Sequence, residues 1–328
     1  MTSFANPTLT LPSRSVGARI TGVGGAQPSG VVSAASLMAP FGKTAEWLRE
    51  RTGIRQVRRL QKHEDLLDLA VKAVGRALDD AGIAIGEVDS MIVATCSGSP
   101  AGQQTLSGRL AARLGLRAPA SDLNSACAGF CYALATAAAL IESGGAGTVL
   151  VVGAERMSAL LDPDDMGTSI LFGDGAGAAV VRPADGAGRG IGPAAWSSDG
   201  AMRGVLTIPE GRTTMQMAGQ QVFRWAVEEV HKVATDAIAK AGLGVGDIEV
   251  FVPHQANLRI IDAVKRQLKI GHATTATDIV DSGNTSAASI PIALARLRHS
   301  GQAKRGQLAL LTGFGAGLSI AAQVIALP

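Results

Sequence analysis

Apolar residues recur along the chain with two kinds of spacing. In some stretches they return every three or four positions and the stretch ends at glycine, as in Glu64–Ala81 before Gly82, which predicts a helix. Elsewhere apolar residues form short uninterrupted runs between polar or glycine-rich segments, which predicts buried strands. The predicted helices are Glu64–Ala81, Leu106–Leu114 and Ala126–Ile141, and the predicted strands are Val88–Thr95, Thr148–Val152, Ala178–Val181 and Ile248–Val252. Because strands and helices alternate, we expect a layered α/β fold.

An internal repeat indicates that the fold is duplicated. Ala77–Asp89 resembles Ala237–Glu249 at a constant offset of 160 positions, with alanine at 77/237 and 81/241 and glycine at 82/242 and 86/246. Both copies predict the end of a helix, a glycine and then an apolar strand. Gly175–Gly177 and Gly315–Gly317 are both Gly-Ala-Gly followed by an apolar run. The alternative explanation is chance similarity between segments that are all rich in alanine and glycine.

The repeat predicts two halves, one over residues 15–182 and one over residues 183–328. The segment Pro183–Gly211, which is rich in glycine, proline, alanine and serine, is the predicted linker. Ligand sites often lie where two such halves join. We therefore expect catalytic groups from both halves.

The composition excludes several classes of protein. Of the 328 residues, 47% are hydrophobic and 17% are charged, which excludes a disordered chain, and the net charge of +3 gives no reason to expect a nucleic-acid partner. The mean hydropathy is +0.24, yet no run of about 18 apolar residues predicts a membrane helix. Three cysteines and no export signal near Met1 lead us to expect a cytoplasmic protein without disulfides.

Three separated residues are candidates for catalysis. Cys127 is expected at the start of the Ala126–Ile141 helix, where the helix dipole favours the thiolate and lowers the thiol pKa toward neutrality. His254 follows the strand Ile248–Val252, and a histidine at a strand end can project into a crevice. Asn284 lies in a loop and offers an amide donor for developing negative charge. Each of the three also has a plainer interpretation as a packing or hydrogen-bonded structural residue.

Other motifs are absent or incomplete. The chain has no G-x-S-x-G elbow, which argues against a hydrolase, and Gly22–Gly25 lacks the third glycine of a dinucleotide fingerprint. Cys96 and Cys131 are expected to pack in the interior. The Cys127–Cys131 spacing has no histidine or cysteine partners nearby, so we expect no metal site.

Three motifs, taken together and in this order, resemble the β-ketoacyl-[acyl carrier protein] synthase III family, the initiating condensing enzymes of the thiolase superfamily. They are Ala126–Phe130, His254–Asn257 and Gly283–Ser289. The resemblance covers nearly the whole chain, because it also includes Glu46–Ile54, Phe172–Gly177 and Gly313–Gly317. It implies a thiolase-like α/β fold, in which two duplicated halves form a five-layered αβαβα sandwich, and a homodimer.

The resemblance also implies a reaction. An acyl-CoA starter would undergo decarboxylative Claisen condensation with malonyl-[acyl carrier protein], which initiates fatty-acid or polyketide synthesis without a cofactor. Cys127 would carry the acyl group as a thioester, and His254 and Asn284 would stabilise the enolate left by loss of CO2. The backbone N–H groups of Cys127 and Ala316 would form the oxyanion hole, where family members often have glycine at the second position.

Two groups of binding residues are carried over from the resemblance. Trp47 and Arg51 would lie near the CoA adenine, because an indole stacks on a purine and a guanidinium suits phosphate. Basic residues would attract the acidic carrier protein. A packing or solvent-exposed helix face is the alternative in both cases. The substrate- and CoA-binding set is Trp47, Arg51, Gly219, Phe223 and Asn257, and the docking set is Arg224, Arg259, Lys265 and Arg266.

The chain departs from the family pattern at two places. Met166 stands where family members have an arginine that sandwiches the adenine against Trp47, which implies weaker CoA binding or a different acyl donor. The segment Ser97–Ser107 has no aromatic residue of the kind that fills the acyl pocket in acetyl-selective members. We therefore expect a roomier pocket that accepts branched or longer starters.

Two other functions fit the same scaffold. One is an acyltransferase that passes the acyl group of Cys127 to an alcohol or amine in secondary metabolism. The other is a non-catalytic partner subunit. The Cys-His-Asn set favours condensation, because Asn284 serves an enolate, and non-catalytic subunits commonly lack the nucleophile that this chain retains.

Overall fold

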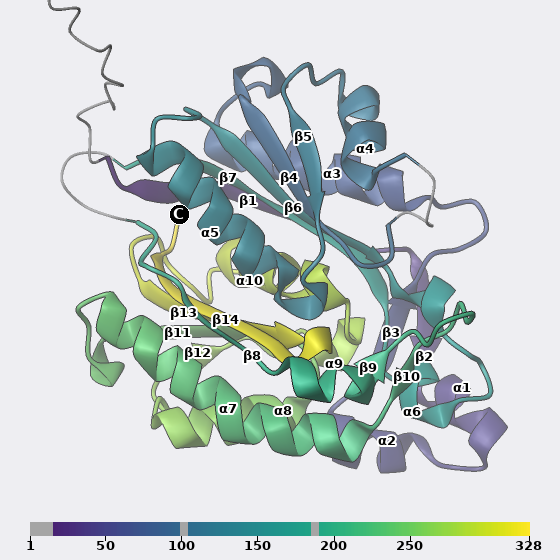
Figure 1. Cartoon of the computed structure of the whole chain (residues 1–328). Helices are drawn as coiled ribbons and strands as arrows, with labels where there is room; N and C mark the ends of the chain where they lie inside the picture. The colour runs from purple at the N-terminus through teal and green to yellow at the C-terminus, as the bar shows by residue number, and fades with distance from the viewer. Residues whose placement is uncertain (1–15, 99–103, 185–189) are drawn as a thin grey trace, which may run out of the picture.

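Two five-stranded sheets and three layers of helices make up the molecule (Figure 1). The computed structural model describes residues 16–98, 104–184 and 190–328. One pair of helices covers the outer face of the first sheet, a second pair separates the sheets, and a third pair covers the outer face of the second sheet. This is the predicted αβαβα order. From the first outer layer to the last, the helices are α3 (Leu66–Ala81) and α4 (Leu106–Leu114), α5 (Gly129–Glu142) and α10 (Ser289–His299), and α7 (Gly219–Lys240) and α8 (Leu258–Leu268).

The two sheets have the same topology. The first has the strand order β1-β7-β6-β4-β5, with β4 parallel to both neighbours and β7 antiparallel to both. The second has the order β12-β11-β13-β14-β8, with β11 parallel to both neighbours and β14 antiparallel to both. The strands of the first sheet are β1 (Ala18–Ala26), β4 (Ser90–Ala94), β5 (Ala120–Leu123), β6 (Val149–Arg156) and β7 (Asp174–Pro183). Those of the second are β8 (Ala195–Ser198), β11 (Val250–Pro253), β12 (Thr274–Thr275), β13 (Leu308–Gly315) and β14 (Ser319–Ala326).

Short elements gather at one end of the sandwich (Figure 1). Two hairpins and four short helices lie there, and α2 begins with a Thr44 cap and ends at Gly53. The hairpins pair β2 (Gly30–Ser33) with β3 (Gln56–Arg59) and β9 (Leu206–Thr207) with β10 (Gln216–Met217). The helices are α1 (Ala34–Met38), α2 (Ala45–Thr52), α6 (Met166–Ser169) and α9 (Ile279–Ser282).

The duplication keeps its offset of 160 positions through several elements. The 3₁₀ turn η2 (Ile85–Glu87) corresponds to η6 (Val245–Asp247), and β4 corresponds to β11. Farther along, the turn η3 (Ala126–Ala128) corresponds to η7 (Ser286–Ala288), and each turn is followed at once by a central helix. The repeat seen in the sequence is therefore a repeat of structure, and chance similarity does not explain it.

Two details of the predicted duplication are wrong. Gly175–Gly177 lies inside β7, whereas Gly315–Gly317 spans the turn between β13 and β14, so the two Gly-Ala-Gly sequences are not equivalent. Pro183–Gly211 is not only a linker, because Ala195–Ser198 pairs with β14 as an edge strand of the second sheet. A four-residue edge strand in a glycine-rich segment has too little hydrophobic pattern to be recognised.

The predicted Ala126–Ile141 helix is two elements. Ala126 has φ 46°, a left-handed conformation that interrupts a helix, and the amide N–H of Ala126 donates to Asn124 Oδ1 at 3.1 Å. The turn η3 therefore precedes α5, which begins at Gly129. The helix α4 agrees with the predicted Leu106–Leu114, and α3 begins at Leu66 because Asp65 caps it. Two strands are longer than predicted: β6 continues to Arg156 and β7 begins at Asp174.

The core is continuous across the middle layer. α5 is buried on most sides because its residues are small or apolar, and Gly153 of β6 lets η7 approach closely, since a Cβ there would stand 2.5 Å from the Ala287 carbonyl oxygen. The middle layer thus brings both turns that precede central helices to the boundary between the halves.

No helix in the described ranges is long and apolar enough to span a membrane.

Candidate active site

A cavity of about 730 Å³ lies between the two halves, and its lining includes all three catalytic candidates. Cys127 comes from the first half, and His254 and Asn284 come from the second. Their exposed fractions are 6%, 2% and 5%, so each presents a small part of its side chain to the cavity. The structure therefore brings together three residues that lie up to 157 positions apart in the chain.

Cys127 lies in η3, one turn before α5, and its neighbourhood is strained. The residue before it, Ala126, adopts the left-handed conformation that costs an alanine free energy and that the Asn124 side chain stabilises. The corresponding turn in the second half has Ser286 at φ 49°, and Asn284 Oδ1 accepts the amide N–H of Ser286 at 2.8 Å. The nucleophile and its amide partner thus occupy matching turns of the two repeats.

The expectation of a thiol pKa near neutrality is wrong for Cys127. Burial raises the pKa of the Cys127 thiol to about 12, and the charge of Glu155 acts in the same direction. A hydrogen bond with Ser286 lowers this pKa, but by less than burial raises it. The nucleophile therefore rests as a neutral thiol, because desolvation outweighs the favourable position before a helix.

His254 extends from the end of β11 and is held in one orientation. Its backbone N–H donates to the Thr312 carbonyl at 2.7 Å, and its ring lies edge-on to Phe314 with the centroids 5.2 Å apart. Its Nδ1 lies 2.7 Å from Ser289 Oγ, and the same hydroxyl accepts the Gln255 N–H at 3.4 Å. The hydroxyl proton of Ser289 has no other acceptor in the described part of the chain, so it is donated to Nδ1.

The proton on the imidazole is consequently assigned to Nε2. Burial lowers the pKa of His254 to about 3, so the ring is neutral at physiological pH. A neutral ring with Nε2–H is a hydrogen-bond donor that carries no charge, which suits it to bind a carbonyl oxygen that becomes negative during a reaction.

Asn284 also presents a donor to the cavity. Its backbone is fixed on both sides, because its N–H donates to Leu171 at 2.8 Å and its carbonyl accepts the Gly173 N–H at 3.0 Å. The preceding Gly283 has φ 72°, and a Cβ there would stand 2.7 Å from Val57 Cγ1. Since Oδ1 is occupied by the Ser286 amide, the side-chain NH2 group of Asn284 is left for a ligand.

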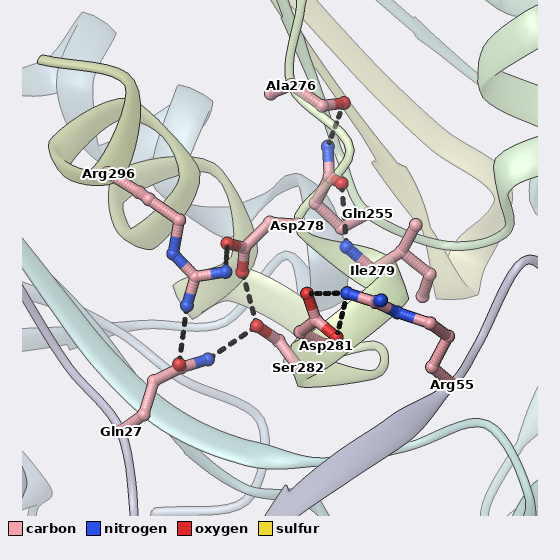
Figure 2. Close-up of polar contacts among 9 residues, drawn as sticks. All are labelled: Gln27, Arg55, Gln255, Ala276, Asp278, Ile279, Asp281, Ser282 and Arg296. Carbon is pink, nitrogen blue, oxygen red and sulfur yellow. Dashed lines mark hydrogen bonds and ion pairs between the residues drawn. The ribbon is translucent and has the colours of Figure 1, made fainter. Parts of the chain in front are cut away.

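Gln255 ties the histidine loop to the helix that leads into Asn284, and sequence reasoning missed it. Its Nε2 donates to the Pro253 carbonyl at 2.7 Å. Figure 2 shows its other two bonds, in which Nε2 donates to the Ala276 carbonyl at 3.2 Å and Oε1 accepts the Ile279 N–H at 3.0 Å. The side chain is 1% exposed. A glutamine beside a predicted catalytic histidine was the available signal, but its partners more than 20 positions away are invisible in one sequence.

A smaller chamber of about 360 Å³ also has Cys127 in its lining, and its surface is mostly apolar. Met157, Phe172 and Met215 form a buried cluster beside it. The chamber suits a hydrocarbon chain attached to the Cys127 sulfur. Of the segment Ser97–Ser107, which the sequence marks as lacking an aromatic, residues 99–103 lie outside the described residues.

Glu155 is a buried carboxylate that the sequence did not single out. It is 0% exposed and accepts the amide N–H groups of Cys96 at 3.1 Å and Ser97 at 3.0 Å. The Thr95 hydroxyl donates to it at 3.2 Å. Burial raises the pKa of Glu155, while these donors favour its charged form. It fixes the end of β4, after which Cys96 lines the smaller chamber.

The segment with the second predicted oxyanion donor lies close to Cys127. Gly315 approaches so closely that a Cβ there would stand 2.8 Å from the Cys127 Cβ. The next residue, Ala316, begins the turn η8 (Ala316–Leu318) and lines the smaller chamber with Cys127. The assignment of the two backbone N–H groups as an oxyanion hole stays a prediction.

The five residues of the predicted CoA set all line the larger cavity: Trp47, Arg51, Gly219, Phe223 and Asn257. The Arg51 guanidinium lies 4.3 Å from the centroid of the Trp47 ring, and Asn257 holds the same segment through a 3.1 Å hydrogen bond to the Arg51 carbonyl. Met166 packs against the apolar core that includes Ile170 and Trp225 and is not part of the cavity lining, whereas its neighbour Gly167 is. Arg51 thus supplies a cation against the indole.

The four predicted docking residues have different surroundings. Arg224 and Arg259 line the larger cavity and are exposed. Arg266 is exposed on α8, two turns beyond Arg259, with Asp262 between them on the same face. The Lys265 ammonium donates to the Ala273 carbonyl at 3.1 Å, so it is partly committed to the protein itself. Elsewhere among the described residues, no group of three potential ligands suggests a metal site.

Comparisons with known proteins match nearly the whole chain. A family model for 3-oxoacyl-[acyl-carrier-protein] synthase III matches residues 121–200, and a model for the C-terminal part of the same family matches residues 238–327. The β-ketoacyl-[acyl-carrier-protein] synthase III of Streptomyces lividans is 44% identical, covering 98% of each chain, and that of Streptomyces glaucescens is 42% identical, covering 95% of this chain and 96% of its own.

Solved structures share the fold. The priming β-ketosynthase of the R1128 polyketide biosynthetic pathway superposes with a TM-score of 0.94 at 43% identity, covering 98% of this chain and 99% of its own. The 3-oxoacyl-[acyl-carrier-protein] synthase III of Aquifex aeolicus superposes with a TM-score of 0.89 at 34% identity, covering 94% of this chain and 100% of its own.

Proposed function

Since this chain belongs to the β-ketoacyl-[acyl-carrier-protein] synthase III family and is an acyl-transferring condensing enzyme with a thiolase-like fold, we propose that its larger cavity condenses an acyl-CoA starter with malonyl-[acyl carrier protein]. The observation that carries the mechanism is the pairing of two uncharged N–H donors, on His254 and Asn284, in one cavity with the Cys127 thiol. The product is 3-oxoacyl-[acyl carrier protein], which starts a fatty-acid or polyketide chain.

In the first step, Cys127 Sγ attacks the thioester carbonyl of the acyl-CoA. The carbon–sulfur bond to CoA breaks, and the thiol proton leaves with the CoA sulfur, so no net charge is created. The backbone N–H groups of Cys127 and Ala316 stabilise the tetrahedral oxyanion. Trp47 and Arg51 hold the adenine and phosphates of CoA at the cavity entrance, with Gly219, Phe223 and Asn257 along the channel.

In the second step, malonyl-[acyl carrier protein] replaces CoA. His254 Nε2–H and the Asn284 amide donate to the malonyl thioester oxygen, and loss of CO2 leaves the electron pair as an enolate stabilised by both donors. The enolate carbon attacks the acyl group on Cys127 and displaces the thiolate, which takes a proton from solvent. Every step is acyl transfer or decarboxylation, so the proposed reaction needs neither a metal nor a redox cofactor, and a dialysed enzyme should keep its activity.

The steps are separable by experiment. We expect His254→Ala and Asn284→Ala to load an acyl group onto Cys127, detected by intact mass, while CO2 release from carboxyl-labelled malonyl-[acyl carrier protein] falls by about 10²–10³-fold. Cys127→Ala should block loading. Normal CO2 release by both donor variants would contradict the mechanism. Transfer of the acyl group to an alcohol or amine without CO2 release would instead support an O- or N-acyltransferase, which the uncharged Nε2–H donor disfavours because such an acceptor requires a base.

The smaller chamber supports a starter larger than acetyl. Its apolar lining and its volume of about 360 Å³ accommodate a branched or longer chain on Cys127. We expect mass analysis with a panel of acyl-CoAs to show loading of branched or medium-length groups at a rate at least equal to that of acetyl. Strict acetyl selectivity would refute this assignment.

The enzyme works as a homodimer in the cytoplasm. β5 is an edge strand that pairs with β4 on one side, and no strand of the described residues covers its other side. Trp196 and Ile208 are 46% and 41% exposed, which is unusual for large apolar side chains. An unpaired edge and exposed apolar groups support a subunit contact. Light scattering should give twice the chain mass of 33.3 kDa, and fractionation should find the protein with its substrates in the cytosol.

A further inference from the structure

A second polar site lies outside the catalytic cavity. Two neighbouring hollows of about 370 and 530 Å³ share Arg58 of β3 and Arg296 of α10, and together we name them the arginine groove. None of the residues that line the groove lines the larger cavity or the smaller chamber of the candidate active site. The smaller hollow is lined by Gly25, Gln27, Pro28, Arg58, Arg76, Ile292, Ala295, Arg296 and His299, and the larger hollow by Arg55, Gln56, Arg58, Asp281 and Arg296.

Arg55 and Arg296 of the groove are paired with Asp281 and Asp278, which leaves Arg58 and Arg76 as its arginines whose charge no described carboxylate offsets. Three arginines and a histidine line the smaller hollow, and that lining, as far as the chain is described, contains no carboxylate. In the larger hollow the carboxylate is Asp281, and Arg55 holds both of its oxygens at 2.9 and 2.8 Å. The groove thus concentrates positive charge although the chain as a whole carries only +3.

The floor of the groove is held in place before any ligand binds. Figure 2 shows Arg296 between the buried carboxylate of Asp278 and Gln27, whose Oε1 accepts from the guanidinium at 2.7 Å. Gln27 in turn donates to the Ser282 hydroxyl at 2.6 Å. Arg76, which also lines the smaller hollow, donates to the Gly25 carbonyl. Side chains fixed in this way lose little entropy when a ligand binds.

Arg58 is the feature that points to a ligand. Its Nε is buried and has no hydrogen-bond partner, and no ion pair with a described carboxylate neutralises its guanidinium. The Nε atom itself is closed off, so an anion in the hollow would meet the guanidinium at its terminal nitrogens, which are not among the buried unpartnered atoms. The guanidinium fork of arginine matches the oxygens of phosphate two at a time.

We propose that the arginine groove binds a small polyanion of the pyrophosphate class, either free or as the diphosphate of a nucleotide. Two adjacent phosphoryl groups match arginines in two adjoining hollows, and the concave shape favours a small molecule over a protein surface. Ile292 and Ala295 give the smaller hollow an apolar side against which an organic group attached to the diphosphate can pack. This assignment is independent of the condensation reaction.

Titration calorimetry on the full-length enzyme tests the proposal with three probes: orthophosphate, pyrophosphate and a nucleoside diphosphate. With the CoA entrance filled by saturating CoA, pyrophosphate should bind once per chain and more tightly than orthophosphate, and a further gain with the nucleotide would identify the esterified form as the ligand. Arg58→Ala should weaken pyrophosphate binding by about tenfold or more. Arg76→Ala, at an exposed helix position where folding is not at risk, should also weaken it.

The matched control is Arg51→Ala, which removes a guanidinium from the CoA entrance instead of the groove. It should leave pyrophosphate binding unchanged. If Arg51→Ala abolishes binding while Arg58→Ala and Arg76→Ala do not, the polyanion sits at the CoA entrance and the proposal is overturned. Absence of any saturable heat with wild-type enzyme, or binding of an acidic protein alone, would overturn it as well.

Discussion

At the scale of single residues, the position of one proton decides what His254 can do. The Ser289 hydroxyl donates to Nδ1 and thereby keeps the other ring proton on Nε2, facing the cavity. We expect Ser289→Ala to release this constraint, so that part of the imidazole adopts the Nδ1–H form and loses its donor to the enolate. CO2 release from malonyl-[acyl carrier protein] should fall by about ten- to a hundredfold, measured with carboxyl-labelled substrate.

Two observations separate this effect from simple damage. Acyl loading of Cys127 in the Ser289→Ala variant should stay at the wild-type rate, because loading does not use the imidazole donor. Ser289→Thr keeps a hydroxyl at the same place and should recover most of the CO2 release. A variant that loses loading and CO2 release equally would show that Ser289 merely supports packing.

The Cys127 thiol should titrate late. Its pKa is raised to about 12, mainly by burial, so the thiolate fraction of the resting enzyme rises about tenfold per pH unit up to pH 11. Alkylation of Cys127 by iodoacetamide, followed by peptide mapping, should follow this rise. An ordinary thiol levels off near pH 9, and a plateau there would contradict the buried neutral thiol. The unfolded thiol ionises near pH 9, so this residue lowers folding stability as pH rises from 9 to 12.

At the scale of elements, short turns place the catalytic groups. Gly283 at φ 72° leads into Asn284, and a Cβ there would stand 2.7 Å from Val57 and 2.9 Å from the Leu171 carbonyl. We expect Gly283→Ala to destabilise the protein by about 1–3 kcal/mol and to lower CO2 release, because the clash displaces the Asn284 backbone from Leu171. Thermal unfolding and the CO2 assay measure the two effects. Gly86→Ala is the control, since a Cβ at Gly86 meets nothing within 4 Å.

Long elements were predictable from the sequence, and the elements around the site were less so. α3 and α4 are predictable because apolar positions recur over several turns and a glycine ends each helix. The break between η3 and α5 was hidden, because Ala126 is a typical helix residue and the hydrogen bond from its N–H to the Asn124 side chain cannot be read from the sequence. A propensity scale has no means to register that bond.

The three catalytic candidates were predicted from the sequence, but the residues that orient them were not. Cys127, His254 and Asn284 are rare polar side chains in recognisable motifs, whereas Ser289 and Gln255 act through partners in other elements. The thiol pKa was predicted in the wrong direction, because a helix position is visible in the sequence and complete burial is not. Electrostatics at this site follow from packing, which one sequence does not display.

At the scale of the whole molecule, the net charge is only +3, so the proposed attraction of the acidic carrier protein would come from local basic patches. Arg266 is exposed on α8 and does not line the cavity, so it tests docking apart from catalysis. We expect Arg266→Glu to raise the KM for malonyl-[acyl carrier protein] by about tenfold and to leave the KM for acyl-CoA unchanged, because on the proposed docking face Arg266 would meet the carrier protein and not CoA. Steady-state kinetics at low and physiological salt measure both constants.

The comparison variant for docking is Arg117→Glu, an equal change of charge at an exposed position in the first half. It should leave both KM values unchanged. Added salt should narrow the difference between Arg266→Glu and wild type, since screening weakens long-range attraction. An effect of Arg117→Glu as large as that of Arg266→Glu would mean that net charge, and not a docking face, sets the carrier-protein affinity.

The matching turns at Ala126 and Ser286 have the same shape but different functional groups. Both copies keep the asparagine that braces the turn, Asn124 in one and Asn284 in the other, yet the position of Cys127 holds Ala287 in the second copy. In the proposed mechanism, the turn of the first half supplies the nucleophile, and the turn of the second half supplies the side-chain NH2 group of Asn284. Neither copy can replace the other, because an enzyme made of two identical halves would lack either the cysteine or the histidine and the outward-facing amide. Such an enzyme would keep the fold but not the complete set of catalytic groups.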